Sequence, residues 1–194
     1  MIKTARFITS VASPSQMLAS SLPEIAVCGK SNSGKSSFIN MLTGYSRLAK
    51  TAKTPGKTRL INYFDCNNGQ FLLVDLPGYG YAKVSAVQKQ AWSKLIEYYL
   101  EKSVSLKHVF LLLDIRRNPS ADDIGMVNYL YHYSIPFTIV ATKADKISRA
   151  QRAIRKREIA TAFRVGADNI FTTSNVDKMG KEEILQKIQH ILQS

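Results

Sequence analysis

The amino-acid sequence predicts an α/β fold, with a mostly parallel six-stranded sheet, one antiparallel edge strand and helices on both faces. Short apolar runs of strand length alternate along the chain with segments whose apolar residues recur at helical spacing. One hairpin signal, Asn67-Asn68-Gly69, joins two of these runs. The other runs are separated by crossovers long enough to contain a helix, and such crossovers connect parallel strands. The hairpin therefore supplies the one antiparallel strand.

The chain is expected to begin with an N-terminal extension, residues 1–22, which is followed by one domain that spans residues 23–194. The extension contains a possible edge strand, Phe7–Val11, and a linker with Ser and Pro. A polar, basic connection between residues 45 and 57 has no periodicity, which is typical of a functional or mobile loop. Periodicity predicts strands at 25–28, 59–66 and 71–75, and helices at 37–42, stopped by Gly44, and at 85–101.

The second half continues the alternation of strands and helices. Asp122 or Asp123 is expected to cap the helix that contains Ile124 and Val127. The remaining elements are predicted as strands at 109–115, 137–141 and 170–173 and helices at 150–163 and 181–192. A basic cluster lies on the helix at 150–163 and just before it. This cluster is either a solvated face or a contact for RNA phosphates. Its residues are Arg149, Arg152, Arg155, Lys156 and Arg157.

Net charge and cysteine content indicate which partners and which cellular environment the protein has. The 194 residues suit one domain, and their net charge of +13 favours a polyanionic partner such as nucleic acid over a basic surface without a dedicated partner. Cys28 and Cys66 both fall in strand-like runs, so we expect them to be core residues in a reducing cytosol. The sequence shows no signal peptide and no run of roughly 20 apolar residues. We expect a soluble, cytoplasmic monomer with no membrane partner.

The stretch after the first strand has the P-loop pattern G-x-x-x-x-G-K-S, as Gly29-Lys30-Ser31-Asn32-Ser33-Gly34-Lys35-Ser36. Because it lies between a strand and a helix, its backbone N–H groups are expected to converge on phosphate oxygens. Lys35 is expected to lie along the β- and γ-phosphates, and the Ser36 hydroxyl to ligate Mg²⁺. A chance match on a glycine-containing turn is the alternative. The flanking elements favour a nucleoside triphosphate site.

A second motif, Asp75-Leu76-Pro77-Gly78, follows the strand at 71–75. A carboxylate at the end of a buried strand can hold the Mg²⁺ shell through water, and the glycine can bring a backbone N–H to the γ-phosphate. As an isolated string this pattern is weak, because Pro-Gly is a common turn. Its distance from the P-loop makes it a strong indication of a loop that responds when the γ-phosphate leaves.

The base is indicated by Thr142-Lys143-Ala144-Asp145, just after another buried strand. A carboxylate can accept two hydrogen bonds from guanine N1–H and its exocyclic amine, whereas adenine has no such donor pair. The stem of Lys143 would cover the flat face of the base. The alternative is a solvated helix cap. After the last strand, the loop Thr172-Thr173-Ser174-Asn175 is expected to contact guanine O6 through backbone N–H groups.

Together these motifs resemble those of translation-factor-type small GTPases, and more narrowly the EngB (YihA/YsxC) family of bacterial ribosome-assembly GTPases, in the TrmE-Era-EngA-EngB-septin-like class. The resemblance covers the chain from about residue 23 to its end. The strings that carry it are Lys53–Arg59, Val74–Val84, Asp114–Asp123 and Ala141–Lys146. It implies a Ras-like P-loop G domain, Mg²⁺-dependent GTP hydrolysis, a role in assembly of the large (50S) ribosomal subunit and a link to cell division and septation.

The resemblance also assigns roles to individual residues. Thr58, rather than the nearby Thr54, is implied as the switch threonine that completes the Mg²⁺ shell with Ser36. The nucleotide-contacting stretch around it is Gly56-Lys57-Thr58-Arg59-Leu60. The family usually has Phe-Ser-Ser in the last guanine loop, and here Phe171-Thr172-Thr173-Ser174-Asn175-Val176 leaves its register open by one or two residues.

Hydrolysis has an unusual setting in this sequence. Tyr79 follows Gly78 at the position where Ras-type enzymes place the glutamine that orients the attacking water. Resemblance to potassium-stimulated GTPases implies that Asn32 is a K⁺ ligand, and a K⁺ beside the phosphates could neutralise developing charge. The residues expected to take part in catalysis are Asn32, Lys35, Thr58 and Gly78.

The leading hypothesis is a weak GTPase that switches between GTP and GDP on large-subunit precursors. The alternative is a nucleotide-gated RNA- or ribosome-binding module with negligible hydrolysis. A P-loop ATPase or nucleotide kinase conflicts with Thr142–Asp145.

Overall fold

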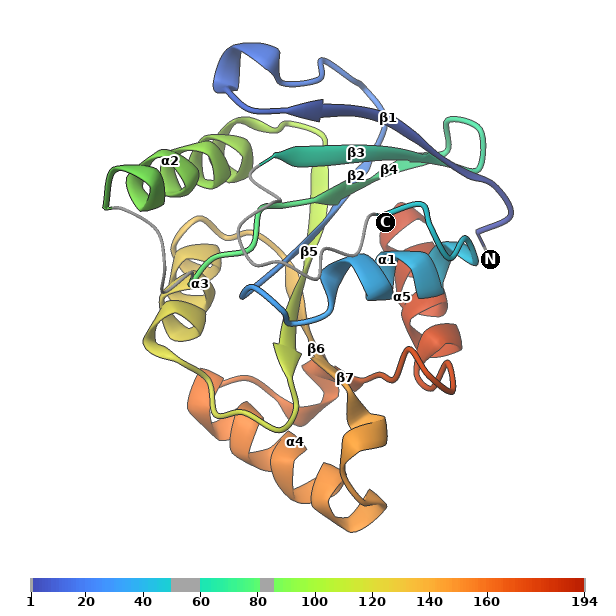
Figure 1. Ribbon diagram of the computed structural model, residues 1–194, viewed down its shortest axis with the longest axis vertical. Coiled ribbons are helices and arrows are strands. Elements are labelled where there is room, and N and C mark those ends of the chain that lie inside the picture. Colours follow the sequence, from blue (N-terminus) through green and yellow to red (C-terminus); the bar gives the residue numbers. More distant parts are fainter. Residues whose placement is uncertain (1, 50–59, 81–85, 194) are drawn as a thin grey trace.

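The computed structural model describes residues 2–49, 60–80 and 86–193, with the side chains of its second α-helix described from Lys94 onward. Its centre is one sheet with strand order β1-β3-β4-β2-β5-β6-β7 (Figure 1). The strands are β1 Ala5–Val11, β2 Glu24–Gly29, β3 Ile61–Cys66, β4 Phe71–Asp75, β5 Leu106–Asp114, β6 Phe137–Thr142 and β7 Ile170–Thr172. The α-helices are α1 Lys35–Thr43, α2 Ala86–Lys102, α3 Ala121–His132, α4 Arg149–Phe163 and α5 Lys181–Gln193. Three short 3₁₀ turns are η1 Pro14–Gln16, η2 Ala144–Lys146 and η3 Ala167–Asn169.

The predicted fold class is confirmed, but the prediction of six strands is wrong. The described residues form seven strands, because β1 pairs antiparallel with β3, from Ala5 opposite Cys66 to Val11 opposite Ile61. The antiparallel strand β3 therefore lies one place inside the sheet, and β1 covers it as the edge (Figure 1). The register of β1 shifts between Phe7 and Thr9. Such a bulge breaks the alternation that marks a strand in a sequence. The division at residue 23 between an extension and the domain stays a prediction.

The hairpin between β3 and β4 follows from its turn residues. Asn67, Asn68 and Gly69 all have positive φ, at 56°, 53° and 88°. Asparagine and glycine adopt this left-handed conformation at little cost, and such turns match the twist of the strands that they join. The turn therefore fixes the register in which Cys66 faces Phe71 across the hairpin.

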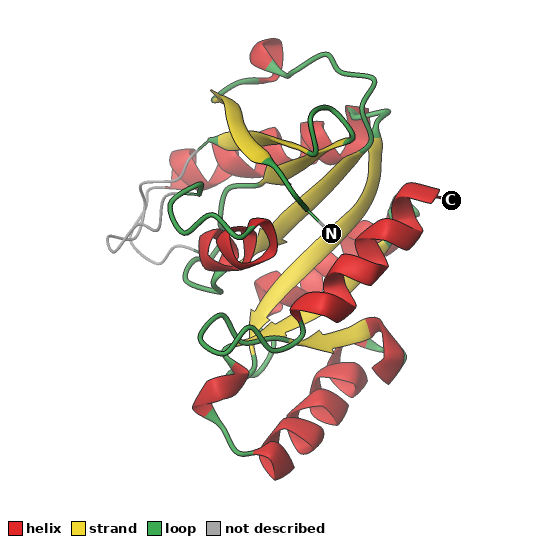
Figure 2. Cartoon of the chain, turned by 90° about the vertical axis from the view of Figure 1, so that its right-hand side faces the viewer, coloured by secondary structure: helices red, strands yellow, loops and turns green. Residues whose placement is uncertain are grey.

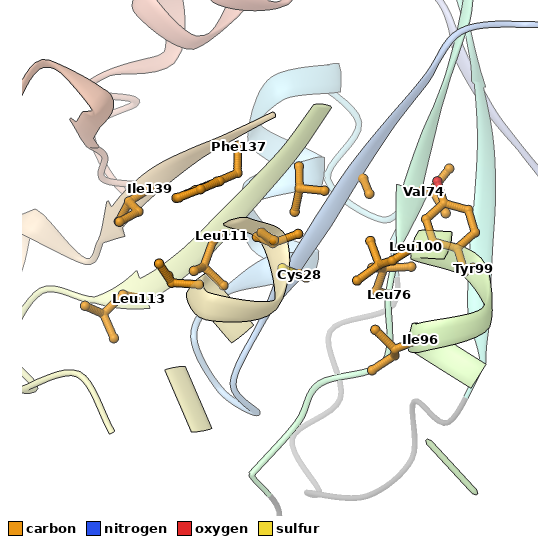
Figure 3. Packing of buried hydrophobic residues seen from close by; sticks show 14 of the residues in the cluster. Cys28, Val74, Leu76, Ile96, Tyr99, Leu100, Leu111, Leu113, Phe137 and Ile139 are labelled. Atoms are coloured by element: carbon orange, nitrogen blue, oxygen red, sulfur yellow. The ribbon is translucent and has the colours of Figure 1, made fainter. Parts of the chain in front are cut away.

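Alternating side chains of the strands build two apolar layers. On one face, α2, α3 and α4 cover a cluster that includes Cys28, Leu111 and Ile139. Figure 3 shows Ile96, Tyr99 and Leu100 from α2 in this cluster. On the other face, α1 and α5 cover a second cluster that includes Val27 and Phe110. The helix ending at the C-terminus in Figure 2, α5, lies along this face. The part of the chain that the structure describes contains no helix that is apolar and long enough to span a membrane.

The start of α3 differs from the prediction. Its N-cap is Ser120, and neither Asp122 nor Asp123 takes that place. The Ser120 side chain accepts from the backbone N–H of Asp123, and the Asp123 carboxylate accepts from the backbone N–H of Ser120 at 2.8 Å. This reciprocal capping box places the acidic residue three positions after the cap, inside the first turn. Asp123 is thereby buried and has a further contact that is described below.

Candidate nucleotide-binding site

The predicted motifs meet at one edge of the sheet. The P-loop follows β2, the Asp75–Gly78 loop follows β4 and the Thr142–Asp145 loop follows β6, and these strands run parallel within the sheet. Parallel strands present their carboxyl ends at the same edge, where open α/β sheets bind ligands. Residues 56–59, including Thr58, lie outside the described residues, and Leu60 immediately precedes β3 and is half-buried.

The P-loop backbone depends on two glycines. Gly29 has φ of 147°, and a Cβ at this position would lie 2.5 Å from the carbonyl oxygen of Leu112. Gly34 is the N-cap of α1, with φ of 101°, and gives no side-chain oxygen to the helix. The first N–H groups of a helix have no intrahelical partner, and their partial positive charge attracts anions. The start of α1 can therefore receive phosphate oxygens.

Lys35 lies across the P-loop. Its Nζ donates to the Gly29 carbonyl at 3.3 Å. A Cβ at Gly78 would lie 2.9 Å from Nζ and 3.2 Å from the Cα of Ser31. The Asp75–Gly78 loop thus comes so close to the P-loop that Gly78 has no room for a side chain. Lys35 and the backbone of Gly78 face the same space, as a γ-phosphate site requires.

Asp75 is a buried carboxylate with an open position. It is 2% exposed, and burial raises its pKa to about 6 although Lys35 and Asn62 act against the shift. Its Oδ1 has no hydrogen-bond partner among the described residues, and neither has the buried Oγ of Ser33. A buried polar atom without a partner costs free energy. An ion with bound water fits this donor set, because carboxylate and water oxygens are ligands that Mg²⁺ prefers.

Tyr79 is held at both ends. Its carbonyl accepts from the N–H of Ser31 at 2.9 Å, next to a parallel bridge between Lys30 and Tyr79. Its hydroxyl donates to Oδ1 of Asp123 at 2.8 Å, in the capping box of α3. Burial raises the pKa of Tyr79 well above its usual range, so the phenol keeps its proton. The phenol therefore has a structural partner in α3.

The role of Asp123 as a partner of Tyr79 was not expected from the sequence. The string Ser120-x-x-Asp123 is itself the signal, because it is the pattern of a capping box. What the pattern does not give is the third partner, Tyr79, which is 44 residues away.

The loop after β6 is fastened to the P-loop. Thr142 Oγ1 donates to the Ser33 carbonyl at 2.6 Å. Lys143 has a left-handed backbone, with φ of 61°, and its Nζ donates to the Asn32 carbonyl at 2.7 Å. The same Nζ lies 3.1 Å from Oδ2 of Asp114. These contacts connect the two predicted loops, one for the base and one for the phosphates, into one structure.

Asp114 is a second residue whose role the sequence analysis missed. It ends β5, is 4% exposed and pairs with Arg116 Nη2 at 2.7 Å as well as with Lys143. Burial acts to raise the pKa of Asp114, but hydrogen bonds from Arg116 and Lys143 lower it to about 2. Its permanent negative charge positions the ammonium group of Lys143.

Asp145 lies in the 3₁₀ turn η2 and keeps an ionised carboxylate. Burial acts to raise its pKa, but the side chains of Lys146 and Ser174 lower it below the usual range. Oδ2 of Asp145 lies 3.0 Å from Nζ of Lys146. An ionised carboxylate only accepts hydrogen bonds, so Asp145 suits a ligand edge that carries donors.

In the loop after β7, two of the backbone N–H groups bond within the protein. The N–H of Thr173 donates to the Ala141 carbonyl at 2.8 Å, and that of Ser174 to the Met179 carbonyl at 3.1 Å. In the described part of the chain, the N–H of Asn175 donates to no protein group. A Cβ on Gly34 would lie 3.9 Å from Nδ2 of Asn175, so this side chain borders the P-loop. The N–H groups of Thr173 and Ser174 are therefore already bonded within the protein, whereas that of Asn175 is free for a ligand.

Comparisons with known proteins agree with this geometry. The family model described as "50S ribosome-binding GTPase" matches residues 24–143. A probable GTP-binding protein EngB from Desulfosudis oleivorans is 47% identical over 188 residues, which cover 97% of this chain and 95% of that protein. The crystal structure of a probable GTP-binding protein EngB matches with a TM-score of 0.73 and 22% identity, over 88% of this chain and 98% of the other.

A further structural match is the crystal structure of Era in complex with MgGDPNP and nucleotides 1506–1542 of 16S ribosomal RNA. It has a TM-score of 0.67 and 22% identity, over 86% of this chain and 55% of that one. At this identity the likeness concerns the fold, which is that of Ras-like P-loop G domains. The family model and the 47% identity over nearly the whole length show the family as well as the fold. This chain belongs to the EngB family of GTP-binding proteins, within the 50S ribosome-binding GTPases.

Proposed function

We propose that this protein binds GTP with Mg²⁺, hydrolyses it slowly to GDP and phosphate, and uses the change to control its binding to precursors of the large (50S) ribosomal subunit in the cytoplasm. The observation that carries the proposal is the convergence of Lys35, Asp75 and Asp145 on one edge of the sheet. Lys143 joins the Asp145 loop to the P-loop, and the N–H of Ser31 joins the P-loop to the loop after Asp75. Family membership supports the same activity. We also propose a link to normal cell division and septation, which the family resemblance supports.

Each part of the nucleotide has a group that suits it. Asp145 accepts from guanine N1–H and its amine, and the Asn175 N–H donates to guanine O6. The start of α1 and Lys35 hold the phosphates. Ser36 and Thr58 would hold Mg²⁺, and the unpartnered Oδ1 of Asp75 would accept from its bound water. When bound, the ion would neutralise part of the phosphate charge.

Tyr79 is the reason to expect slow hydrolysis. It has no amide to orient water, and its hydroxyl is already bound to Asp123 at 2.8 Å. Asn32 is exposed and has a left-handed backbone, with φ of 65°, which Lys143 stabilises through the Asn32 carbonyl. The side chain of Asn32 is thus presented at the rim of the phosphate site on a fixed backbone. We assign it to a K⁺ that supplies positive charge to the transition state.

K⁺ is therefore expected to accelerate GTP turnover about tenfold or more over Na⁺ at equal ionic strength, because the proposed Asn32 site would hold K⁺ in preference to Na⁺ and so place a positive charge near the phosphates. Phosphate release under multiple turnover, in KCl and in NaCl, measures the effect. Asn32→Ala should remove the difference and leave GDP affinity within a fewfold of wild type. Equal rates in both salts for the wild-type protein would rule out this role of K⁺.

A ribosomal partner is supported by the net charge of +13 and by the family. The solved Era complex contains ribosomal RNA together with MgGDPNP, so a protein that includes a domain of this fold binds RNA while it holds a GTP analogue with Mg²⁺. Loops that contact the γ-phosphate change when it leaves, which gives nucleotide state a route to the binding surface. The competing function is a nucleotide-gated binding module with negligible hydrolysis.

Cosedimentation with large-subunit precursors tests the proposal. We expect the protein to pellet with the particles in the presence of a non-hydrolysable GTP analogue and to remain largely in the supernatant with GDP. Binding should weaken steeply with salt, because phosphate contacts release counterions. Equal pelleting in both nucleotide states would contradict the switch. Nucleotide-dependent pelleting without phosphate release, alone or with particles in KCl, would favour the binding module.

A further inference from the structure

The helix α4 starts directly after the loop that carries Asp145. Its N-cap is Ser148, and a capping box joins Ser148 to Gln151, whose backbone N–H donates to the serine Oγ at 3.3 Å. Ile159 and Phe163 anchor the other end of α4 in the core. In Figure 1, α4 lies at the lower end of the molecule, next to β6 and β7. The helix is therefore a fixed support for the loops on either side of it.

Four of the five basic residues of α4 fall into two groups, and the fifth, Lys156, is half-buried. Arg149 and Arg157 are exposed, as a solvated or RNA-binding face requires. Arg152 and Arg155 are half-buried and donate to other parts of the protein. Arg155 holds the loop after β5 through the carbonyls of Ile115 and Arg117. Inward hydrogen bonds thus occupy two of the five basic residues that the sequence presents as one cluster.

Arg152 contacts both loops that are assigned to the base. Its Nε donates to the Ala144 carbonyl at 2.8 Å and to the Ile147 carbonyl at 3.3 Å. Its Nη1 lies 3.3 Å from Sδ of Met179. Ala144 and Ile147 flank Asp145 on the first loop. The Met179 carbonyl accepts from the N–H of Ser174 on the second.

The two loops are otherwise joined by few direct contacts. Ala144 N–H donates to the Thr173 carbonyl at 3.1 Å, and Ser174 contributes to the lowered pKa of Asp145. A guanidinium group is planar, carries several donors in a fixed arrangement and stays charged at all relevant pH values. It can therefore fix two carbonyls and a sulfur at once, which the single point charge of a lysine cannot do.

We infer that Arg152 is a positioning residue for guanine recognition, which sets the direction of the Asp145 carboxylate relative to the Ser174–Asn175 loop. The inference rests on the proposed function, in which Asp145 accepts from guanine. Without Arg152 the turn that carries Asp145 loses two of its anchors, so the two hydrogen bonds to the base can no longer form together. The preference for guanine over other bases should therefore decrease more than the affinity for the phosphates.

The test compares GDP with IDP, which lacks the exocyclic amine of guanine and so offers Asp145 one donor fewer. Dissociation constants of both are measured for the full-length wild type and for Arg152→Ala by equilibrium titration. We expect the wild type to prefer GDP roughly tenfold or more, because one hydrogen bond to a charged group is lost in IDP. In Arg152→Ala we expect GDP affinity to fall roughly tenfold and the preference to shrink at least threefold.

Arg157→Ala is the matched control, because it removes an exposed arginine from the same helix, and it should leave the preference unchanged. Arg152→Lys keeps the charge and should give an intermediate preference; it also carries the test if Arg152→Ala does not fold. A wild-type protein that binds GDP and IDP equally would refute recognition of the exocyclic amine by Asp145, and with it the guanine preference of the proposed function. A clear wild-type preference that Arg152→Ala and Arg152→Lys both retain would refute the role of Arg152 alone.

Discussion

Replacing Lys35 with alanine is expected to weaken GDP and GTP binding by roughly 30- to 5,000-fold, which corresponds to about 2–5 kcal/mol for removal of one partner from a buried charge pair. The physical reason is the location of its ammonium group. Nζ bonds the Gly29 carbonyl and faces the backbone of Gly78, so it lies where the β- and γ-phosphates are assigned. Titration of the protein with fluorescent GDP and GTP measures the loss.

Lys35 also lowers the cost of ionising Asp75, whose pKa burial raises to about 6. The variant therefore needs a check of folding by circular dichroism, and Lys107→Ala is the matched control, because Lys107 is exposed near the start of β5. A folded Lys35→Ala protein that binds GTP within threefold of wild type would show that the phosphates lie elsewhere.

Replacing Asp145 with asparagine is expected to exchange the base preference. The amide of asparagine donates where the carboxylate accepted, so one guanine donor meets a donor and the paired hydrogen bonds are lost. Two hydrogen bonds to a charged group correspond to a loss of roughly 10²- to 10⁴-fold in GDP affinity. Xanthine carries a carbonyl oxygen in place of the guanine amine, so XDP should bind the variant more tightly than GDP does.

Competition of GDP, XDP and ADP against a fluorescent nucleotide decides the matter. Asp168→Asn, at an exposed site in η3, is a suitable control and should retain the preference for guanine. Tight ADP binding by the wild-type protein would overturn the assignment of the base. A variant that keeps its preference for GDP over XDP would mean that another group recognises the exocyclic amine.

Much of the fold could be predicted because local residue chemistry determines it. The Asn67–Gly69 turn and the Gly44 stop of α1 each require positive φ, and both have it in the structure. Buried strands such as β4, predicted at 71–75, are marked by continuous apolar runs. The edge strand β1 was not counted in the sheet, because its bulge near Ile8 removes the alternation and pairing with β3 is a long-range contact.

The candidate site also has parts that the sequence predicts and parts that it does not. Its loops could be located because glycine-rich and acidic motifs follow strands at fixed spacing. The side-chain partners Tyr79–Asp123 and Arg152–Ala144 could not, because they join residues on different elements. A basic helix sequence does not distinguish an arginine that points inward, such as Arg152, from one that points outward. In the last loop, the sequence does not show that the Ser174 N–H is already bonded to the Met179 carbonyl.

The ammonium group of Lys143 fixes the distance between two parts of the nucleotide site. It ties the base loop to the Asn32 carbonyl at 2.7 Å and to Asp114 at 3.1 Å. A base subsite and a phosphate subsite at a fixed separation behave as a bivalent receptor, and a nucleotide is the bivalent ligand that matches it. Once the phosphates are bound, the ribose presents guanine at a high effective concentration, on the order of millimolar or above. Guanosine and pyrophosphate, offered as separate molecules, lack this linkage and would compete poorly with GDP.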